Sequence, residues 1–576
     1  MKILLIHSDF IEYEAKKQAI KDAEKAEKGP VRVKEALVVF SSVEKADEAS
    51  PDEIIGNAVK EILDVQRQVK AASIVIYPFV HLSSTPSSPS AALHVLKGIE
   101  SKLKEGNLDV KRAPFGWYKG FDLRCKGHPL AELSREITAK GGAAKPGKPA
   151  PPAPAAEEEI DVNRLLREIG KTKLDREKLK DNDHRIIGQQ LDLFSFSDAA
   201  PGMAFWHPKG LIIWNELVRF WRELHREAGY QEISTPQIMD NRIWKISGHW
   251  EKYRDNIFLT QYEGRPFAVK PMNCPGGIMI YRNRARSYND LPMRMAELGV
   301  VHRQELSGVL SGLFRVIKFT QDDAHIYCKE EQLEEEILAV ISLAEKFYRK
   351  FGLEYHMELS TRPEKRIGSD EAWDRAEAAL KAALDKRGIK YKVNEGDGAF
   401  YGPKIDFHIK DSLGRTWQCG TNQLDFAMPE RFDLAYKDKD NTDKRPVMLH
   451  RTVYGSLERF IGILLEHTSG NLPLWLSPVQ ARVLSFTDRN VKAAGEAAKR
   501  FSEAGIRADA DLGNNTVNYK VREAEMQKIP YIIVIGDKEE EAGTIAVRVR
   551  GEKKVRFGVK AGEFQKELLE RIGKFE

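Results

Sequence analysis

Short apolar runs alternate with amphipathic stretches over the first 140 residues or so of the chain. Ile3–Ser8, Ala36–Phe40 and Ile74–Pro78 are rich in apolar and β-branched residues and have the length of buried strands. Between them, Pro51–Val69 carries its apolar residues at helical spacing. The pattern predicts an N-terminal α/β domain.

A second α/β pattern occupies the last hundred residues or so. It predicts a strand at Ala481–Phe486, helices at Val491–Ala504 and Val517–Gln527, and a buried strand at Tyr531–Ile535. Gly536 and Asp537 close this last run. Open α/β sheets place their ligands at such carboxyl ends of strands, so we expect a binding surface there.

Between these patterns, residues 141–159 combine prolines, alanines and charges that bury little surface, which predicts an extended, mobile linker. Residues 160–179 have the spacing of a charged connecting helix. The resulting boundaries are 1–138 for the first domain, 139–183 for linker and connector, 184–475 for a long mixed domain and 476–576 for the last domain.

Composition excludes several classes of protein. Among 576 residues, 42% are hydrophobic and 31% are charged, which excludes global disorder. The net charge of +5 is too small to indicate a nucleic-acid partner by itself. No apolar run approaches the length of a membrane span, and the first one is too short for a signal peptide. Four widely spaced cysteines predict reduced thiols in a cytoplasmic protein.

Two arginines are candidates for binding phosphate. Arg303 and Glu305 lie two residues apart, so a strand would present both on one face, with a cation beside an acceptor. Arg459 follows Gly455 in the first turn of an apolar helical run, and a helix N-terminus beside an arginine suits a phosphate group. A surface ion pair and an exposed helical arginine remain the alternatives.

Three residues are candidates for binding metal. Cys274 lies in a turn-forming segment, and His325 and His450 follow at intervals of 51 and 125 residues. These intervals match no local zinc-finger rule, so spacing leaves open whether the three converge. A turn cysteine and two core histidines are the alternative.

Motifs in the middle segment resemble the signatures of class II aminoacyl-tRNA synthetases. Gly229–Pro236 resembles the first, dimer-forming motif, Arg303–Glu305 the second and Gly455–Arg459 the third. Six further strings narrow the resemblance to the threonyl-tRNA synthetases: KPMNCPG, FTQDDAHIYC, LSTRPEKRIGSDEAWDRAEA, GAFYGPKIDF, QCGTNQLDF and VMLHR. The similarity covers nearly all of residues 184–576.

This resemblance implies a role for each matching residue. One Zn²⁺ would be held by Cys274, His325 and His450, with threonine completing its coordination. The residues that would line the threonine pocket are Met272, Gln321, Asp323 and Tyr401. Asp323 would accept a hydrogen bond from the threonine hydroxyl. ATP with Mg²⁺ would be bound by Arg303, Glu305, Arg315, Phe319 and Arg459. His249 would help the terminal ribose hydroxyl of tRNA to attack the adenylate.

One position departs from the bacterial form of the family. The bacterial string continues KPMNCPGH, whereas Gly277 follows Gly276 here. The expected effect is confined to local packing, because the metal ligand itself is retained.

Serine poses a problem of selectivity that predicts a second active site. Serine keeps the hydroxyl and lacks one methyl group, a difference of roughly 1–3 kcal/mol, or about 10–200-fold. Residues 1–136 resemble the archaeal N-terminal editing domain, which is related to D-aminoacyl-tRNA deacylases, in KILLIHSDFIEYEAK, YPFVHLSS, APFGWYKGF and CKGHPLAELSR. The resemblance implies a pocket for seryl-tRNA lined by His81, Lys119 and Glu132. A loop histidine and a solvated lysine are the alternatives.

The last domain resembles the anticodon-binding domain of several class II synthetases. Asn514, Glu539 and Arg548 match positions that read anticodon bases, and polar groups of this kind suit the base edges of a splayed loop. Simple exposure is the alternative for all three, above all for Glu539 within a run of charged residues.

The sequence therefore predicts a multidomain α/β and α+β protein with an antiparallel-sheet catalytic core, a deacylase-like editing domain and an anticodon-binding domain. Its expected activity is ATP-dependent charging of tRNA(Thr) with L-threonine and hydrolysis of seryl-tRNA(Thr), by a cytoplasmic homodimer. Two rivals are an RNA-binding regulatory paralogue without aminoacylation activity and a free-standing tRNA deacylase. Loss of Arg303, Arg459 or a metal ligand would favour these rivals, and all are present.

Overall fold

The structure is a computed structural model. It describes residues 1–139 except 21, 28, 84, 107 and 129, then positions 162, 163, 166 and 169, and then 179–576 without the side chain of Lys252. The predicted linker and most of the predicted connecting helix lie outside these residues. The chain divides into two compact units, Met1–Ile160 and Asp161–Glu576.

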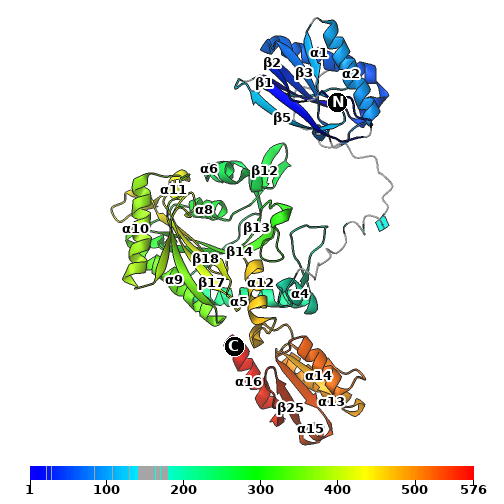
Figure 1. Ribbon diagram of the computed structural model, residues 1–576. Coiled ribbons are helices and arrows are strands. Elements are labelled where there is room, and N and C mark those ends of the chain that lie inside the picture. Colours follow the sequence, from blue (N-terminus) through cyan, green and yellow to red (C-terminus); the bar gives the residue numbers. More distant parts are fainter. Residues whose placement is uncertain are drawn as a thin grey trace. The chain divides into compact units, whose positions relative to one another are not determined.

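The first unit is a six-stranded sheet with two helices (Figure 1). The strand order is β4-β3-β2-β1-β5, and β6 also pairs with β1. The elements are β1 (Lys2–Gln18), β2 (Val31–Ser42), α1 (Pro51–Val69), β3 (Ser73–Pro78), α2 (Pro89–Glu105), β4 (Asp109–Arg112), β5 (Trp117–Cys125) and β6 (Glu132–Glu136). The predicted α/β pattern is thus confirmed.

Local chemistry explains the ends of α1. Pro51 is its first residue, where a missing backbone N–H costs no hydrogen bond, and Lys70 ends it in a left-handed conformation with φ of 56°. Its buried residues recur at helical spacing and pack on the sheet: Ile54, Ile55, Ala58, Ile62 and Val65.

β1 is longer than the predicted strand, which ended at Ser8. It continues through a charged stretch to Gln18 because it is paired on both sides, with β2 on one edge and with β5 and β6 on the other. Backbone pairing on both edges fixes a strand whose outer half lacks a continuous apolar pattern.

The second unit is built on an eight-stranded sheet in the order β16-β15-β17-β18-β21-β14-β13-β9. All neighbours are antiparallel except the two edge pairs, β16 with β15 and β13 with β9. The strands are β9 (Gln231–Glu232), β13 (Met293–His302), β14 (Lys318–Cys328), β15 (Glu354–Ser360), β16 (Tyr391–Asn394), β17 (Lys404–Lys410), β18 (Thr416–Asp425) and β21 (Val447–Thr452). This confirms the predicted antiparallel-sheet core.

Helices and small sheets surround this core. The helices are α4 (His184–Gln190), α5 (Pro208–Glu227), α6 (Arg242–Ile246), α7 (His249–Tyr253), α8 (Cys274–Arg282), α9 (Leu333–Lys350), α10 (Asp370–Lys386), α11 (Ala427–Arg431) and α12 (Leu457–Thr468). The small sheets consist of β7 (Phe194–Ser195), β8 (Phe205–Trp206), β10 (Ile238–Asp240), β11 (Leu259–Tyr262), β12 (Arg265–Val269), β19 (Tyr436–Lys437) and β20 (Asp443–Lys444).

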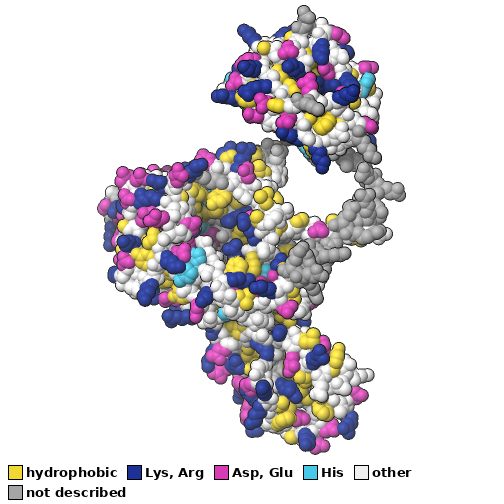
Figure 2. Space-filling view, in the orientation of Figure 1, with side chains coloured by type: hydrophobic (Ala, Val, Ile, Leu, Met, Phe, Trp, Pro, Cys, Tyr) yellow, Lys and Arg dark blue, Asp and Glu magenta, His cyan; other side chains and the backbone are white. Residues whose placement is uncertain are grey.

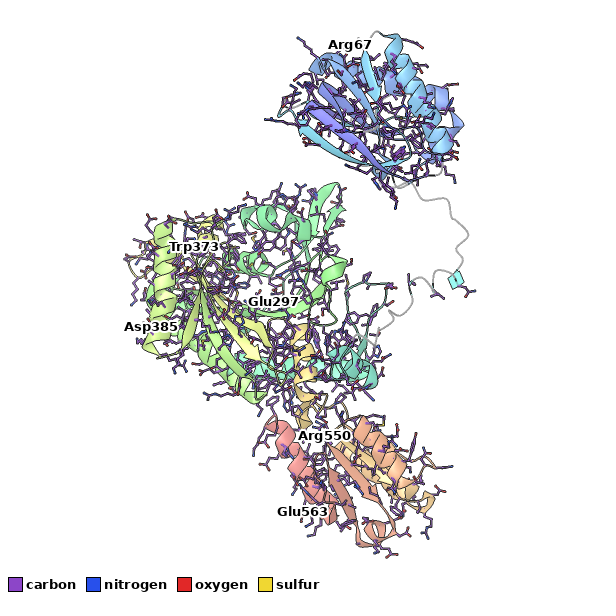
Figure 3. All side chains as sticks on the ribbon, in the orientation of Figure 1. Arg67, Glu297, Trp373, Asp385, Arg550 and Glu563 are labelled. Carbon is purple, nitrogen blue, oxygen red and sulfur yellow. The ribbon has the colours of Figure 1, made fainter. Side chains whose placement is uncertain are left out.

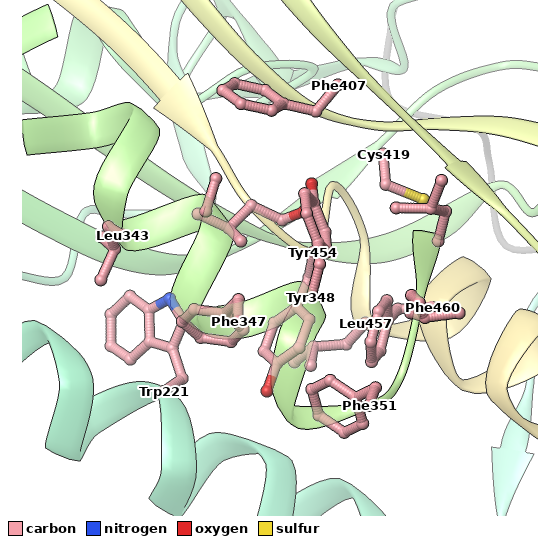
Figure 4. Close-up of a cluster of buried hydrophobic side chains, with 14 of the residues drawn as sticks. Trp221, Leu343, Phe347, Tyr348, Phe351, Phe407, Cys419, Tyr454, Leu457 and Phe460 are labelled. Atoms are coloured by element: carbon pink, nitrogen blue, oxygen red, sulfur yellow. The ribbon is translucent and has the colours of Figure 1, made fainter. Parts of the chain in front are cut away.

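An aromatic cluster fixes α12 against α9 (Figure 4). The ring centroids of Phe351 and Phe460 lie 5.0 Å apart, and those of Phe347 and Tyr454 lie 4.8 Å apart. All four residues are buried. Because protein interiors are close-packed, this cluster leaves α12 little freedom to shift.

The C-terminal part of the second unit is a five-stranded sheet in the order β23-β22-β24-β25-β26. Its elements are β22 (Ala481–Ser485), α13 (Val491–Glu503), β23 (Ala508–Asp511), α14 (Val517–Met526), β24 (Tyr531–Ile535), α15 (Asp537–Ala542), β25 (Thr544–Val549), β26 (Arg556–Lys560) and α16 (Ala561–Gly573). Figure 3 labels Arg550 between this part and the core, where its guanidinium donates to the Leu472 carbonyl. The predicted elements are confirmed within two residues.

On the visible faces of the described residues, acidic and basic side chains are interspersed rather than separated (Figure 2). This distribution agrees with the small net charge of +5. No helix in the described part of the chain combines the length and apolar character that a membrane crossing needs.

Candidate active site

Three separate elements bring the predicted metal ligands together. Cys274 begins α8, His325 lies on β14 and His450 lies on β21. β14 and β21 pair with His325 directly opposite His450. One ligand atom from each residue lies within 4.8 Å of the other two, and all three residues are buried. The convergence that spacing left open is therefore present.

The chemistry of the donors fits a zinc ion. Nε2 of His325 is buried without a hydrogen-bond partner. Nε2 of His450 lies 2.8 Å from the Asp425 carboxylate, which orients the ring and leaves Nδ1 available. Burial raises the pKa of the Cys274 thiol and lowers the pKa of the His325 imidazole, which favours the neutral form of both groups. A bound cation would offset this effect at Cys274 by favouring the thiolate, and it would bind the neutral imidazole directly. A thiolate and two imidazoles are ligands that zinc commonly takes.

Gly277, the departure from the bacterial string, lies against this cluster. A Cβ atom at Gly277 would stand 3.4 Å from Nδ1 of His325. The Cβ of a larger residue here would therefore lie in van der Waals contact with the ring of this predicted metal ligand.

A second group of possible ligands, Asp183, His184 and Glu466, is explained by hydrogen bonds. Nδ1 of His184 lies 2.7 Å from the Glu466 carboxylate, and Nε2 accepts the backbone N–H of Leu313 at 2.9 Å. Both ring nitrogens are thus engaged, and a metal would have to break one of these bonds. We interpret this group as a support for the segment around Leu313.

The predicted threonine pocket adjoins the metal ligands. Asp323 lies two residues before His325, so both side chains point to the same face of β14. Asn273 donates a hydrogen bond of 3.2 Å to the Asp323 carboxylate, and the Tyr401 ring lies 5.0 Å from that of His450. Gln321 lies on the same face of β14, and Met272 packs against the core cluster that contains Cys274. The structure thus brings the four predicted pocket residues to one region.

The predicted ATP site lies at the neighbouring end of β13 and β14. β13 ends at His302, so Arg303 and Glu305 follow the strand rather than lie on it. The Arg303 guanidinium lies 5.1 Å from the centroid of the Phe319 ring and donates to the Pro271 carbonyl at 3.2 Å. An aromatic ring beside a guanidinium group is suited to binding a planar base next to an anionic group.

Two more predicted ATP ligands are held by partners. Arg315 pairs with Glu305, with 2.9 Å between guanidinium nitrogen and carboxylate oxygen. Arg459 donates to the Phe314 carbonyl at 3.0 Å. In the Arg315–Glu305 pair the Arg315 side chain is 52% exposed and the Glu305 side chain only 14%.

His249 is fully buried at the start of α7. Its Nδ1 lies 2.8 Å from the Ser247 hydroxyl, and its Nε2 has no partner. Burial lowers the pKa of His249 to about 3, so the imidazole is neutral at physiological pH. A neutral imidazole with a free Nε2 is able to accept a hydrogen bond from a hydroxyl group.

A cavity of about 440 Å³ in the first unit contains two of the three predicted editing residues. His81 lies on a short 3₁₀ helix after β3, and Lys119 lies on β5. The Lys119 ammonium donates to the carbonyls of Pro114 and Trp117 at 3.1 Å each. Burial lowers the pKa of Lys119 to about 8. The walls are largely apolar and aromatic, as ligand pockets usually are.

Glu132 is not among the residues that line this cavity. It pairs with Ile6 on β1, whereas Lys119 pairs with Ala15, nine positions away. At about 3.3 Å per residue this is roughly 30 Å. A carboxylate oxygen of Glu132 instead lies 3.5 Å from the Cys125 sulfur. The structure therefore places Glu132 outside the cavity that His81 and Lys119 line, and far along β1 from Lys119.

Two of the predicted anticodon residues lie near one edge of the C-terminal sheet, and the third lies within a strand. Asn514 is exposed just after β23, and Glu539 lies in α15 directly after β24, so both adjoin the carboxyl ends of parallel strands. The Glu539 carboxylate accepts the Gly536 N–H at 3.1 Å and so stabilises the start of α15. Arg548 pairs with Ile532, roughly 10 Å below that edge.

The sequence patterns indicate no role for Asp425 and Asn273, although these residues lie within the strings QCGTNQLDF and KPMNCPG. Asp425 reaches His450 only because β18 pairs with β21. Asn273 reaches Asp323 only because the segment before α8 lies over β14. The intervals of 25 and 50 residues carry no local signal that could have revealed either contact.

Family comparisons agree with this arrangement. Residues 1–137 match the archaea-specific editing domain of threonyl-tRNA synthetase, residues 258–468 the class II core domain of tRNA synthetases for G, H, P, S and T, and residues 478–571 an anticodon binding domain. The antiparallel core with its buried thiol–imidazole cluster, together with these matches, has the domain composition of the class II aminoacyl-tRNA synthetases.

Individual relatives narrow the class. The chain is 57% identical over 397 residues to threonine--tRNA ligase of Carboxydothermus hydrogenoformans, which covers 69% of this chain and 62% of the relative. The chain is also 57% identical over 374 residues to threonine--tRNA ligase of Acetivibrio thermocellus. That match covers 65% of this chain and 59% of the relative. The chain thus matches about three fifths of the length of these relatives.

A solved structure is similar over nearly its whole length. The structure described as the RNA binding domain of threonyl-tRNA synthetase from Cryptosporidium parvum is 40% identical, with a TM-score of 0.65. The match covers 67% of this chain and 98% of that one. The chain belongs to the threonyl-tRNA synthetase family.

Proposed function

We propose that the protein activates L-threonine with ATP to form threonyl-adenylate and transfers threonine to tRNA(Thr). The single observation that carries this proposal is the convergence of Cys274, His325 and His450 beside Asp323. When bound, a zinc ion would offer coordination positions to the amino and hydroxyl groups of threonine. Valine lacks the hydroxyl and would leave a metal position and Asp323 unmatched, so the site would discriminate against valine.

The chain's own residues would position the reactants. Asp323 would accept a hydrogen bond from the threonine hydroxyl, with Gln321 and Tyr401 near the amino group and Met272 lining the pocket. Arg303 would hold the α-phosphate and the carboxylate together, so that the carboxylate oxygen meets phosphorus in line. The remaining ATP contacts would be Glu305 at the adenine edge, Phe319 at its face, and Arg315 and Arg459 with Mg²⁺ at the γ-phosphate. The main catalytic effect of these residues would be to stabilise the negative charge of the phosphate groups in the transition state.

His249 would assist the second step. Its neutral imidazole and free Nε2 support a hydrogen bond to the terminal ribose of tRNA. A tRNA partner is further supported by the match of residues 478–571 to an anticodon binding domain. Asn514, Glu539 and Arg548 would contact anticodon bases there; Glu539 would do so from a side chain that also caps α15.

We further propose a cytoplasmic homodimer. Within the described residues, β9 in the Gly229–Pro236 segment forms an edge of the eight-stranded sheet, and the neighbouring cavity of about 510 Å³ lies between α5 and β9. An open sheet edge of this kind is suited to a partner copy. The four cysteines are free thiols, in keeping with a reducing compartment.

The proposal is tested by threonine-dependent exchange of pyrophosphate into ATP. Zinc-loaded protein should catalyse this exchange with threonine and far less with valine. Absence of exchange in folded, zinc-loaded protein would favour the rival reading, an RNA-binding paralogue without aminoacylation activity.

The first unit would hydrolyse seryl-tRNA(Thr). Its match to the editing domain and its apolar cavity with His81 and Lys119 support this role. Glu132 would need a different role from the one that the resemblance implied, because it lies roughly 30 Å along β1 from Lys119. The pocket residues and the ribose 2′-hydroxyl would together orient the attacking water.

The charge of Lys119 predicts a pH dependence of editing. With its pKa at about 8, Lys119 is mostly protonated at pH 7 and loses its positive charge as the pH rises through 8. The KM for seryl-tRNA, a polyanion, should therefore rise several-fold between pH 7 and 9. Lys119→Arg should abolish this rise, because arginine stays protonated. The measurement is deacylation at each pH, corrected for spontaneous hydrolysis.

Lys111→Arg provides the matched control, since Lys111 is an exposed lysine on β4. This variant should keep the wild-type pH dependence. A wild-type KM that stays constant up to pH 9 would contradict the predicted role of the Lys119 charge.

A further inference from the structure

Two adjacent aspartates on β14 point to opposite faces of the core sheet. Asp323 faces the metal cluster, as described above, whereas Asp322 is fully buried on the other face. The proposed function assigns no role to Asp322. A fully buried carboxylate needs strong hydrogen bonds, so its partners show what it holds in place.

The partners of Asp322 are the backbone amides of one turn. The N–H groups of Val453, Tyr454 and Gly455 donate to its carboxylate, at shortest distances of 2.9, 3.0 and 3.0 Å. The Asp322 carbonyl also accepts from the Arg451 guanidinium at 3.2 Å. Asp322 therefore fixes the whole turn between β21 and α12.

This turn leads directly to the predicted phosphate-binding end of α12. Gly455 has φ of 80°, and a Cβ there would meet the Cys419 carbonyl oxygen at 2.6 Å, so the turn has a single tight path. The next residue, Ser456, caps α12 by accepting the Arg459 N–H at 3.3 Å. The turn that Asp322 holds therefore determines where α12 begins and so where Arg459 lies. In Figure 4, Tyr454 of this turn and Leu457 at the start of α12 lie in the same buried cluster.

We propose that Asp322 is a positioning residue for ATP, which ties the strand bearing the threonine pocket to the turn that sets Arg459. The inference rests on the proposed function. It assigns the neighbouring aspartates to different substrates, Asp323 to threonine and Asp322, through the turn, to ATP. A carboxylate suits this role because it offers two acceptor oxygens and no donor to three convergent N–H groups.

Asp322→Asn tests the proposal in the full-length, zinc-loaded protein. The substituted amide keeps the size of the side chain but turns an –NH₂ group towards backbone N–H groups. We expect the KM for ATP in pyrophosphate exchange to rise about 10- to 100-fold, while the KM for threonine and the zinc content change less than about two-fold. Burial raises the pKa of Asp322 to about 7, so the assay is run at pH 8, where the wild-type carboxylate is ionised.

Asp290→Asn is the matched control. Its carboxylate also accepts a backbone N–H, that of Ser287 at 2.7 Å, but at a turn before β13. This variant should retain both KM values. A purely structural role of Asp322 predicts instead that ATP and threonine KM values change together, and that result would overturn the proposal.

Asp322→Ser provides a second variant with a smaller side chain that still accepts one hydrogen bond. It should also raise the KM for ATP selectively. The proposal fails if both variants keep a wild-type KM for ATP, or if neither yields folded protein, since Asp322 would then determine folding alone. Wild-type protein without exchange activity would refute the proposed function itself, which distinguishes the two failures.

Discussion

Replacing Cys274 by alanine is expected to remove bound zinc and to lower threonine-dependent pyrophosphate exchange by about 1,000-fold or more. Cys274 is one of only three protein side chains in the buried cluster, and its thiolate would supply the charge that balances the cation. Loss of a bound metal removes several kcal/mol of charge stabilisation and of substrate orientation, and about 4 kcal/mol corresponds to 1,000-fold. Metal analysis and exchange kinetics on the same preparation measure both effects.

Cys328→Ala is the matched control for this substitution. Cys328 is also fully buried and lies on β14, but it belongs to the hydrophobic core and not to the metal group. Its loss should leave the zinc content and the KM for threonine unchanged. Full exchange activity in zinc-free Cys274→Ala protein would contradict the proposed mechanism of threonine selection.

A shortened chain that starts near residue 160 is expected to charge threonine normally and to accumulate seryl-tRNA(Thr). Residues Asp161–Glu576 form a compact unit with its own core, so removal of the first unit should leave the synthetic site intact. The missing methyl group of serine gives the synthetic site a discrimination of only about 10–200-fold. At equal concentrations of the two amino acids, roughly one tRNA in 10 to one in 200 should therefore carry serine.

The full-length chain in the same assay is the control, and it should hold seryl-tRNA at background. The product is measured by separating acylated tRNA after reaction with labelled serine. Equal accumulation of seryl-tRNA by both chains would contradict the proofreading role of the first unit.

Much of the local structure could be predicted from residue patterns. The periodic apolar positions of Pro51–Val69 and the apolar run Tyr531–Ile535 predicted a helix and a strand that the structure confirms. Such elements are determined by neighbouring residues, since one buried face specifies both the period and the orientation. The full length of β1 escaped prediction because pairing on both of its edges, rather than its own composition, extends it to Gln18.

The candidate site residues were also predicted only in part. Motif resemblance indicated Cys274, His325 and His450 as metal ligands, and the structure brings one potential ligand atom of each to within 4.8 Å of the others. The same resemblance grouped Glu132 with Lys119, yet the register of β5 and β6 along β1 separates them. A motif carries the identity of a residue, whereas strand register decides which residues meet.

By itself, the sequence predicted the main helices and strands of the N-terminal and C-terminal α/β patterns, and its motifs indicated the family to which the chain belongs. These follow from short-range patterns and from motifs in a fixed order. Only the tertiary structure decided that Asp425 orients His450, that Asp322 holds the turn before α12, and that Glu132 lies far from the editing cavity. The physical reason is that such contacts join residues 25 or more positions apart, and their distances depend on strand pairing and core packing that no local pattern encodes.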